Sequence, residues 1–424
     1  MKPEDMRRDL PITQQYIYLD NAATTPVPNP VIDVIVEYFE EYCTNVERGA
    51  YSIAAKASEV FDAAREEVAS GLLQCDVEEF IFTRNQTQAA NYVAYALEHP
   101  FLNRWSTGFK FTPPLVKWTP ECKIVTTLLE HHSNFLPWLR LAKHVNAQFQ
   151  TITPTMDGRL FPEMFANIVD EKTKFVAFQH ASNAMGTKHD VPAIIRTIKS
   201  ANPNCLVFID GAQGVGHMPL DVKTLGCDFY SFSGHKGPLG PPGTGGLFVR
   251  EELLKRMAPA EVGGGAIASV TADDYMLRSD HRARRWDAGT PNIIGLIGLG
   301  AAVKYLNRIG VKRVADHEHK LTKYLLDGIR DIPNLIVYGP SEDMTWKIGA
   351  VCFNVKGWGS YDVSLALDSQ WKILTRSGHH CCQPLMHILG LLNKFNGNVR
   401  ASFHYYNLLE EVDTLIEALK TLAG

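Results

Sequence analysis

The chain has 424 residues, of which 45% are hydrophobic, 10% aromatic and 21% charged. This usage is that of an ordinary folded globular protein, and it excludes the collagen-like, coiled-coil and disordered classes. Because 42 basic and 46 acidic residues leave a net charge of only −4, we expect a small-molecule ligand and no nucleic-acid partner.

The N-terminus and the longest apolar segment predict a soluble, cytoplasmic protein with no membrane contact. Charged residues fill positions 4, 5, 7, 8 and 9, where a secretory signal peptide would be apolar. The longest apolar run, 293–303, is too short to cross a membrane. The eight cysteines form no C-x-x-C pair and are too few for a disulfide framework in a chain of this length, which fits a reducing compartment.

From residue 31 to about 250, helical patterns alternate with short β-branched or aromatic runs. The helices are predicted at 31–42, 57–72, 86–97, 160–169 and 191–199. The strands are predicted at 80–83, 123–127, 149–153, 174–178, 206–209, 229–232 and 246–249. Such alternation is typical of an α/β domain around a mostly parallel sheet, which binds its ligands beyond the carboxyl ends of the strands.

The pattern changes near residue 293. A long helical stretch is followed by predicted strands at 335–338, 349–355 and 371–374 and by a helix from about 408, which indicates a second, smaller α/β domain. We therefore assign residues 16–292 to a large domain and residues 1–15 with 293–424 to a small one. Residues 100–122 exceed the usual connection of about 4–6 residues and are expected to form an ordered surface insertion.

Two predicted strands place reactive groups at their carboxyl ends. Asp210 directly follows the run 206–209, and Lys236 comes shortly after the run 229–232. A lysine beside a carboxylate suits pyridoxal phosphate (PLP), because the lysine can form a Schiff base with it and the carboxylate can keep its pyridine nitrogen protonated. The alternative that this pair leaves open is a structural salt bridge.

An anion site is predicted where the strand 80–83 gives way to the helix 86–97. The free backbone N–H groups of a helix N-terminus attract a phosphate, and Thr87 adds a hydroxyl. The simpler interpretation is a helix cap formed by the Asn or Thr side chains at this point. The glycine-rich segment 211–216 does not match the dinucleotide-binding pattern, so a nucleotide cofactor is not expected.

Seven segments follow one another along the chain: 18–23 (YLDNAA), 130–134 (EHHSN), 182–186 (SNAMG), 210–213 (DGAQ), 233–236 (SGHK), 288–292 (AGTPN) and 376–381 (RSGHHC). In this order they resemble the motif set of class V, fold-type I PLP enzymes. Within that class the chain is most similar to the SUF-type (group II) cysteine desulfurases and selenocysteine lyases. The resemblance implies an α/β fold of fold-type I, with a large PLP-binding domain and a smaller C-terminal α/β domain that carries the cysteine loop.

The resemblance also implies roles for individual residues. Lys236 would hold PLP covalently, Asp210 would pair with its pyridine nitrogen, and His131 would stack on its ring and serve in proton transfer. The other cofactor contacts would come from Gln86, Thr87, Asn183, Gln213, Ser233 and His235, and from Thr290 of the other subunit of a homodimer. The substrate would be bound by Asn183, Arg376 and Arg400, the last through a bidentate contact with its carboxylate.

Cys381 matches the nucleophile of the family, which takes sulfur from L-cysteine as a persulfide and leaves L-alanine. An accessible thiolate is needed, and His379, His380 and Arg376 are expected to lower its pKa through their positive charge. Four consecutive residues, 379–382, cannot all ligate one tetrahedral ion, so no metal is predicted. Cys382 is expected to be a bystander.

The predicted function is therefore a cysteine desulfurase that passes sulfur to a protein acceptor or scaffold for iron–sulfur cluster or thio-cofactor assembly. A selenocysteine lyase, which would use the same residues on L-selenocysteine, stays open. So does a class V aminotransferase or epimerase in which Cys381 is incidental. A non-catalytic scaffold is disfavoured, since it would need neither Lys236 nor Cys381. The sequence departs from the family at Glu47, where many relatives have histidine.

Overall fold

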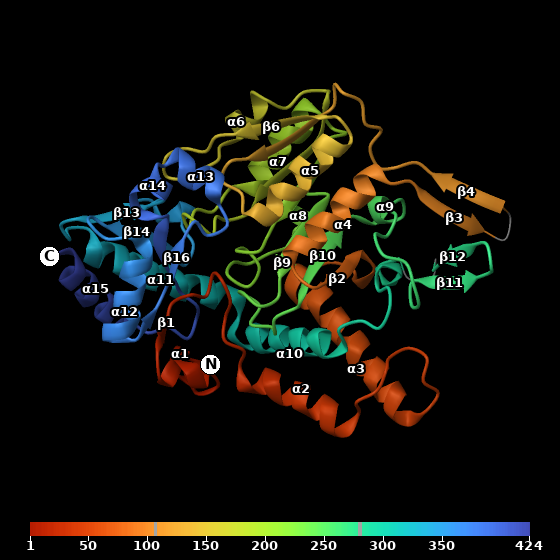
Figure 1. Cartoon of the computed structure of the whole chain (residues 1–424). Coiled ribbons are helices and arrows are strands. Elements are labelled where there is room, and N and C mark those ends of the chain that lie inside the picture. The colour runs from red at the N-terminus through yellow and green to blue at the C-terminus, as the bar shows by residue number, and fades with distance from the viewer. Residues whose placement is uncertain (106–107, 279–281) are drawn as a thin grey trace.

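The computed structural model describes residues 1–105, 108–278 and 282–424, with the backbone alone for the strand residues between 101 and 111. A large sheet lies at the centre of the molecule, and the C-terminal helices and strands, blue in Figure 1, lie at one side of it. Both termini lie near this C-terminal part (Figure 1). Two hairpins lie at the opposite side.

The large sheet has the strand order β2–β10–β9–β8–β7–β5–β6. Its strands are β2 (Phe80–Thr83), β5 (Lys123–Thr127), β6 (Gln148–Ile152), β7 (Thr173–Gln179), β8 (Leu206–Asp210), β9 (Phe229–Ser233) and β10 (Gly245–Val249). All run in one direction except β10, which is antiparallel to β2 and β9. The strands predicted for this part of the sequence are confirmed, and so is the mostly parallel sheet.

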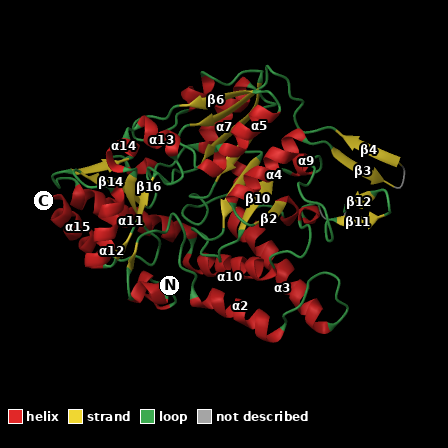
Figure 2. Ribbon diagram, in the orientation of Figure 1, coloured by secondary structure: helices red, strands yellow, loops and turns green. Residues whose placement is uncertain are grey.

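Helices cover both faces of this sheet (Figure 2). They are α2 (Asn29–Glu41), α3 (Ser52–Val68), α4 (Gln86–Glu98), α5 (Leu136–His144), α7 (Val191–Ala201) and α10 (Ile293–Ile309). In β8, Val207 and Ile209 join the core that contains α2 and α3, whereas Phe208 joins the core beneath α4 and α5. Successive side chains of a strand point to opposite faces, so a strand buried on both faces is an almost continuous apolar run.

The C-terminal part is built around a four-stranded antiparallel sheet of order β13–β14–β17–β16. Its strands are β13 (Leu335–Tyr338), β14 (Ala350–Val355), β16 (Arg376–Gly378) and β17 (Asn398–Ser402). Helices α11 (Val311–Ile329), α12 (Ser360–Trp371) and α15 (Leu409–Ala423) share one apolar core with this sheet. The smaller C-terminal α/β region predicted from the sequence is therefore confirmed.

Two predicted elements are shorter than expected. The helix predicted at 160–169 is reduced to α6 (Pro162–Ala166), in which Pro162 sets the first turn. The strand predicted at 371–374 is reduced to β15 (Ile373–Leu374), because Lys372 takes a left-handed φ of 59° that ends α12. β15 pairs in parallel with β1 (Ile17–Tyr18). The remaining short helices are α1 (Pro3–Arg8), α8 (Val222–Leu225), α9 (Glu251–Leu254), α13 (Gln383–Ile388) and α14 (Leu391–Phe395).

The insertion at 100–122 contains a hairpin that the sequence analysis did not predict. β3 (Phe101–Trp105) pairs antiparallel with β4 (Gly108–Thr112). A second hairpin, formed by β11 (Ile267–Val270) and β12 (Tyr275–Leu277), lies beside it. Both project from the body of the molecule (Figure 1).

The segments next to the predicted domain boundaries contact both the C-terminal part and the core of the large part. Arg7 Nη1 of α1 lies 2.6 Å from Glu411 Oε1 of α15, whereas Met6 and Leu10 share the core of α2 and α3. Helix α10 shares that core too, so the predicted boundaries at 15/16 and 292/293 both stay predictions. None of the described helices is by itself long and apolar enough to cross a membrane, and α10 with α11 meets that criterion only as a pair bent by 71°.

Candidate active site

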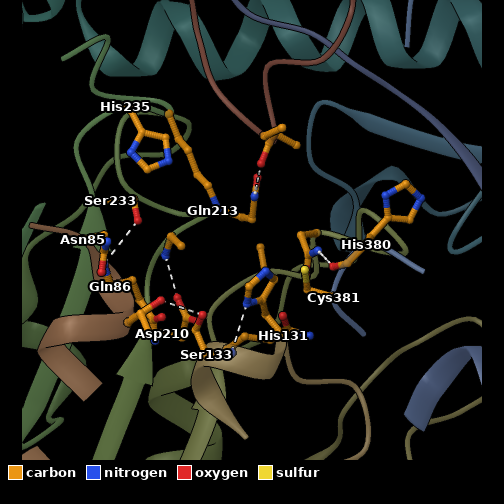
Figure 3. Close-up of a pocket in the computed structure, with 18 of the residues that line it drawn as sticks. Asn85, Gln86, His131, Ser133, Asp210, Gln213, Ser233, His235, His380 and Cys381 are labelled. Atoms are coloured by element: carbon orange, nitrogen blue, oxygen red, sulfur yellow. Dashed lines mark hydrogen bonds between the residues drawn. The ribbon is translucent and has the colours of Figure 1, made fainter. Parts of the chain in front are cut away.

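A cavity of about 240 Å³ lies at the carboxyl ends of β7, β8 and β9, where they meet the loop that follows β16. The predicted site residues that line it are Gln86, Thr87, His131, Asn183, Asp210, Gln213, Ser233, His235, Lys236, Arg376, Cys381 and Arg400. Figure 3 shows Ser233 and His235 at one side of the cavity and Cys381 at the other, with His131 between them. Segments far apart in the sequence thus form one site.

Lys236 and Asp210 differ in accessibility, since Asp210 is buried and Lys236 is partly accessible. Burial lowers the pKa of the Lys236 amine from 10.5 to about 8, although the charge of Asp210 opposes this shift. Burial also raises the pKa of Asp210 to about 6, against the 2.9 Å hydrogen bond that its Oδ1 accepts from the Ala212 N–H. An amine with a pKa near 8 is partly unprotonated at neutral pH, and it can then act as a nucleophile or a base.

The first turn of α4 forms one end of the cavity. Asn85 caps this helix, because its Oδ1 accepts a hydrogen bond of 2.9 Å from the Gln88 N–H. The Gln86 N–H donates to Ser233 Oγ at 3.3 Å. Gln86 Nε2 and His235 Nδ1 are buried without a hydrogen-bond partner among the described residues. Unpaired polar groups beside a helix N-terminus fit an anion such as a phosphate.

His131 lies at the start of the short turn His132–Asn134. Its Nδ1 accepts a hydrogen bond of 3.1 Å from the Ser133 N–H, so the ring proton of the neutral form is on Nε2. Burial and then the charge of Lys236 lower the pKa of His131 to about 3, which leaves the ring neutral at neutral pH. Ser133 also holds Thr87 through a 2.7 Å hydrogen bond between the two hydroxyl groups.

Two residues that were predicted to contact the cofactor also have partners within the chain. Gln213 Nε2 donates to the Ala22 carbonyl at 2.7 Å. Asn183 Nδ2 donates to the His380 carbonyl at 2.8 Å, while its Oδ1 is buried and unpaired within the part of the chain that the structure describes. Asn183 therefore also supports the loop that carries Cys381.

Arg400 and Arg376 face each other from the neighbouring strands β17 and β16. Arg400 is buried, with its Nη2 2.9 Å from Asp20 Oδ1 and its Nη1 donating to the Asn183 carbonyl at 2.9 Å. Arg376 is half-exposed, and its Nη1 lies 3.7 Å from Asp20 Oδ2. Two guanidinium groups share one carboxylate, so this end of the cavity keeps a positive charge that suits the carboxylate of an amino acid.

Cys381 lies on a tightly held loop. His380 and Cys381 both take left-handed backbone conformations, with φ of 47° and 54°, which cost non-glycine residues roughly 1–2 kcal/mol each. The His132 N–H donates to the Cys381 carbonyl at 2.6 Å, and the Cys381 N–H donates to His379 Nδ1 at 3.0 Å. These contacts hold the partly exposed Cys381 at the wall of the cavity (Figure 3).

The charge near Cys381 differs from the expectation that both neighbouring histidines add positive charge. His380 is buried, with its Nε2 2.6 Å from Asn398 Oδ1, and burial lowers its pKa well below the usual range. His380 is therefore neutral. His379 uses its Nδ1 as an acceptor for the Cys381 N–H, which requires a lone pair on that nitrogen. Arg376 is the permanent positive charge among the three predicted groups.

Cys382 is inert where it lies. It is buried, and its Sγ donates to the Leu129 carbonyl at 3.0 Å. Burial raises the pKa of its thiol well above the usual value. This environment supports the expectation that Cys382 is a bystander.

Thr290 does not line the cavity. It lies with residues 45–48 and 264–265 along a separate hollow of about 230 Å³. Its predicted contact with a phosphate therefore requires a second subunit and stays a prediction.

The site also contains residues that the sequence did not assign to the cofactor or the substrate. Asn85, Ser133 and Gln179 line the cavity, and Asp20 joins the two arginines. Asn85 is the asparagine just before the helix predicted at 86–97, Ser133 lies in the motif 130–134, and Asp20 lies in the motif 18–23. Gln179 has a signal of another kind, since it is a polar residue at the carboxyl end of the buried strand β7.

Comparison with known proteins identifies the family. The sequence profile described as Aminotransferase class-V matches residues 17–415. The chain belongs to this family. Among its class-V relatives, a protein named probable cysteine desulfurase from Methanothermobacter thermautotrophicus is 40% identical over 100% of this chain and 99% of its own length.

Solved structures share the fold of this chain over nearly its whole length. The apo structure of a cysteine desulfurase from Thermococcus onnurineus NA1 matches with a TM-score of 0.90 at 39% identity, over 100% of this chain and 98% of that one. A protein solved with glycine covalently linked to its PLP cofactor matches with a TM-score of 0.81 at 21% identity, over 98% of this chain and 99% of that one, a likeness of fold alone. The predicted fold of PLP enzymes is confirmed, while the SUF-type subgroup stays a prediction.

Proposed function

We propose that this chain is a PLP-dependent cysteine desulfurase, which converts L-cysteine into L-alanine and holds the released sulfur as a persulfide on Cys381. The observation that carries the proposal is the convergence of Cys381, Lys236 and Arg400 on one cavity. They supply a thiol, an amine and a group that binds carboxylates. Relatives that match along the full chain and are named cysteine desulfurases support it.

The residues of the cavity fit PLP as the cofactor. The unpaired polar atoms of Gln86 and His235, beside the first turn of α4, would bind its phosphate. The Asp210 carboxylate would pair with its pyridine nitrogen, and the Lys236 amine would bind its aldehyde carbon. When bound, PLP supplies an electron sink for the Cα atom of an attached amino acid.

The side chains of the protein then divide the remaining work. Arg400, with Arg376, binds the carboxylate of the substrate and so fixes that end of the amino acid. The Lys236 amine, with a pKa near 8, takes the proton from Cα and returns it to Cα before alanine leaves. His131 is neutral and carries its ring proton on Nε2, from which it can serve in proton transfer. The Cys381 thiolate attacks the sulfur of the substrate: an S–S bond forms, the Cβ–S bond breaks, and the electron pair stays with carbon, which takes a proton to complete the methyl group of alanine.

The proposal extends to assembly and to the fate of the sulfur. Since Thr290 lies outside its own cavity, a homodimer in which it completes the phosphate site of the other subunit is part of the proposal. The persulfide would pass to a protein acceptor or scaffold for iron–sulfur cluster or thio-cofactor assembly. We propose the cytoplasm as the compartment in which this transfer takes place.

The deciding experiment measures alanine and sulfide released from cysteine in the presence of a reductant. We expect Cys381→Ala to lower sulfide release by at least ~100-fold, because the nucleophile is lost, while the visible absorbance of bound PLP stays unchanged. Cys382→Ala is the matched control. Since Cys382 is buried outside the cavity, this variant should keep its activity to within about twofold.

Three results would change the assignment. A native rate of sulfide release by Cys381→Ala would contradict the persulfide step. If the same variant released selenide from selenocysteine as fast as the native protein, a selenocysteine lyase would be favoured. A protein that cannot be loaded with PLP would overturn the assignment altogether.

A further inference from the structure

Two turns that carry active-site residues touch each other through their backbones. One follows β8 and begins at Asp210, and the other follows β9 and bears Lys236. At Gly216, with φ of 83°, an added Cβ would lie 2.3 Å from the carbonyl carbon of Gly237, and at Gly237 it would lie 2.2 Å from the Val215 oxygen. Glycine at both positions permits this approach. The contacts of Gly237 therefore help to place Lys236, together with the 2.7 Å hydrogen bond from Thr25 Oγ1 to the Lys236 carbonyl.

Three buried side chains gather next to Gly237. They are His217 from the turn after β8, Glu318 from α11 and His404 from the loop after β17. His217 Nδ1 lies 2.9 Å from Glu318 Oε1, and His404 Nε2 lies 3.1 Å from the Gly237 carbonyl oxygen. A carbonyl only accepts, so His404 donates. The cluster joins the turn of Lys236 to two elements of the C-terminal part.

Metal ions can also be bound by two histidines and a glutamate, and here one ligand atom from each side chain lies within 4.8 Å of the others. Both close contacts nevertheless have the length of ordinary hydrogen bonds. The two imidazole rings also pack edge to face, with 5.5 Å between their centroids. Hydrogen bonds account for these distances without an ion.

We propose that His404, His217 and Glu318 are positioning residues that fix the turn bearing Lys236 against the C-terminal part of the chain. His404 holds the Gly237 carbonyl directly. His217 packs against Gly237, where an added Cβ would lie 2.8 Å from its Cδ2, and Glu318 orients His217. The role of Lys236 rests on the proposed function. How firmly the cluster holds the turn can be measured independently of that function.

The test compares His404→Phe with His404→Gln in the cofactor-free chain. Phe keeps a ring but removes the donor, whereas Gln can place an N–H where Nε2 was. The Leu239 and Gly240 N–H groups bond to the Lys236 and Gly234 carbonyls within the turn. We expect their hydrogen exchange to become about tenfold faster in His404→Phe and to stay near the native rate in His404→Gln.

His99→Phe is the matched control. His99 Nδ1 makes the same type of bond, at 3.0 Å to the Tyr95 carbonyl at the C-terminal end of α4, so its loss should leave exchange at Leu239 and Gly240 unchanged. In the PLP-loaded protein, we expect His404→Phe to lower kcat for cysteine about tenfold, with KM changed by less than about twofold, because the reactive amine is displaced. The pH midpoint of the visible absorbance should shift in the same variant and return in His404→Gln.

Three outcomes would overturn the positioning role. The first is native exchange at Leu239 and Gly240 in His404→Phe. The second is an equal loss of protection in the Phe and Gln variants, since the donor would then not be what matters. The third is stoichiometric zinc in the native protein that disappears in His404→Phe. If exchange follows the expectation while the loaded protein releases no sulfide from cysteine, the proposed function fails and the positioning role stands.

Discussion

Lys236, Asp210 and His131 share one cavity, and burial moves their pKa values in opposite directions according to their charge. The pKa falls to about 8 for Lys236 and to about 3 for His131, while it rises to about 6 for Asp210. Burial penalises whichever form is charged, so the two bases lose protons and the acid holds one more strongly. The sequence predicted that these residues meet. It could not predict their protonation, which depends on how deeply each one lies.

We expect Lys236 of the cofactor-free chain to react as an amine with a pKa of about 8 instead of 10.5. Because only the unprotonated amine reacts, the rate of PLP capture should fall as the pH drops below about 8 and level off above it. The capture of PLP is measured by its visible absorbance. Asp210→Asn should move the midpoint to lower pH, since the Asp210 charge raises the pKa of Lys236. A native midpoint near pH 10 would contradict this prediction.

At the scale of secondary structure, the sequence predicted the elements that build the site and missed contacts between distant segments. Strands such as β8 and β9 were predictable because they are buried on both faces and consist mainly of apolar residues. The hairpin β3–β4 was not, because its strands mix charged residues such as Arg104 and Lys110 with apolar ones and form no continuous apolar run. The contact between Asp20 and Arg400 joins residues 380 positions apart. No pattern in the local sequence predicts such a contact.

The Cys381 loop provides the prediction at this scale. Asn183→Ala removes the donor to the His380 carbonyl and leaves two left-handed residues with less support. We expect iodoacetamide to alkylate Cys381 about three- to tenfold faster in this variant, because the loop opens more often, and sulfide release to fall. The alkylated residue is identified by mass spectrometry.

Asn202→Ala is the control for that experiment. The Asn202 amide is also buried and donates to a backbone carbonyl, at 2.8 Å to Thr173, but this bond lies at the opposite end of β7. Its loss should lower stability without changing the reactivity of Cys381. Equal alkylation rates in Asn183→Ala and the native chain would show that other contacts are sufficient to hold the loop.

Across the whole molecule, several histidines are buried in their neutral form. Burial lowers the pKa of His180 to about 4 and that of His189 and His404 to about 3. The unfolded chain takes up a proton at each of these residues near pH 6.5, whereas the folded chain does not. Each of them therefore favours unfolding as the pH falls below 6.5. The buried carboxyl group of Glu130 acts in the opposite sense, since burial raises its pKa to about 8.

His189→Leu isolates one of these contributions, because Glu130 is common to both chains. Neither ring nitrogen of His189 has a hydrogen-bond partner in the described part of the protein, so the substitution breaks no such bond. We expect the free energy of unfolding of the variant to rise relative to that of the native chain as the pH falls from 6.5 to 4. The expected rise is up to about 1.4 kcal/mol per pH unit. Urea unfolding at several pH values measures the difference. A difference that is independent of pH would contradict the prediction.

The pairing of β1 with β15, and the bridge between Asp20 and Ser402, have a consequence for biosynthesis. Residues 17–20 leave the ribosome long before residues 373–402, so the N-terminal strand has no partner while most of the chain is being made. A stalled nascent chain that ends before Arg400 contains the turn of Lys236 but lacks the buried arginine at the other end of the cavity. The active site is therefore completed only after Arg400 has been synthesised.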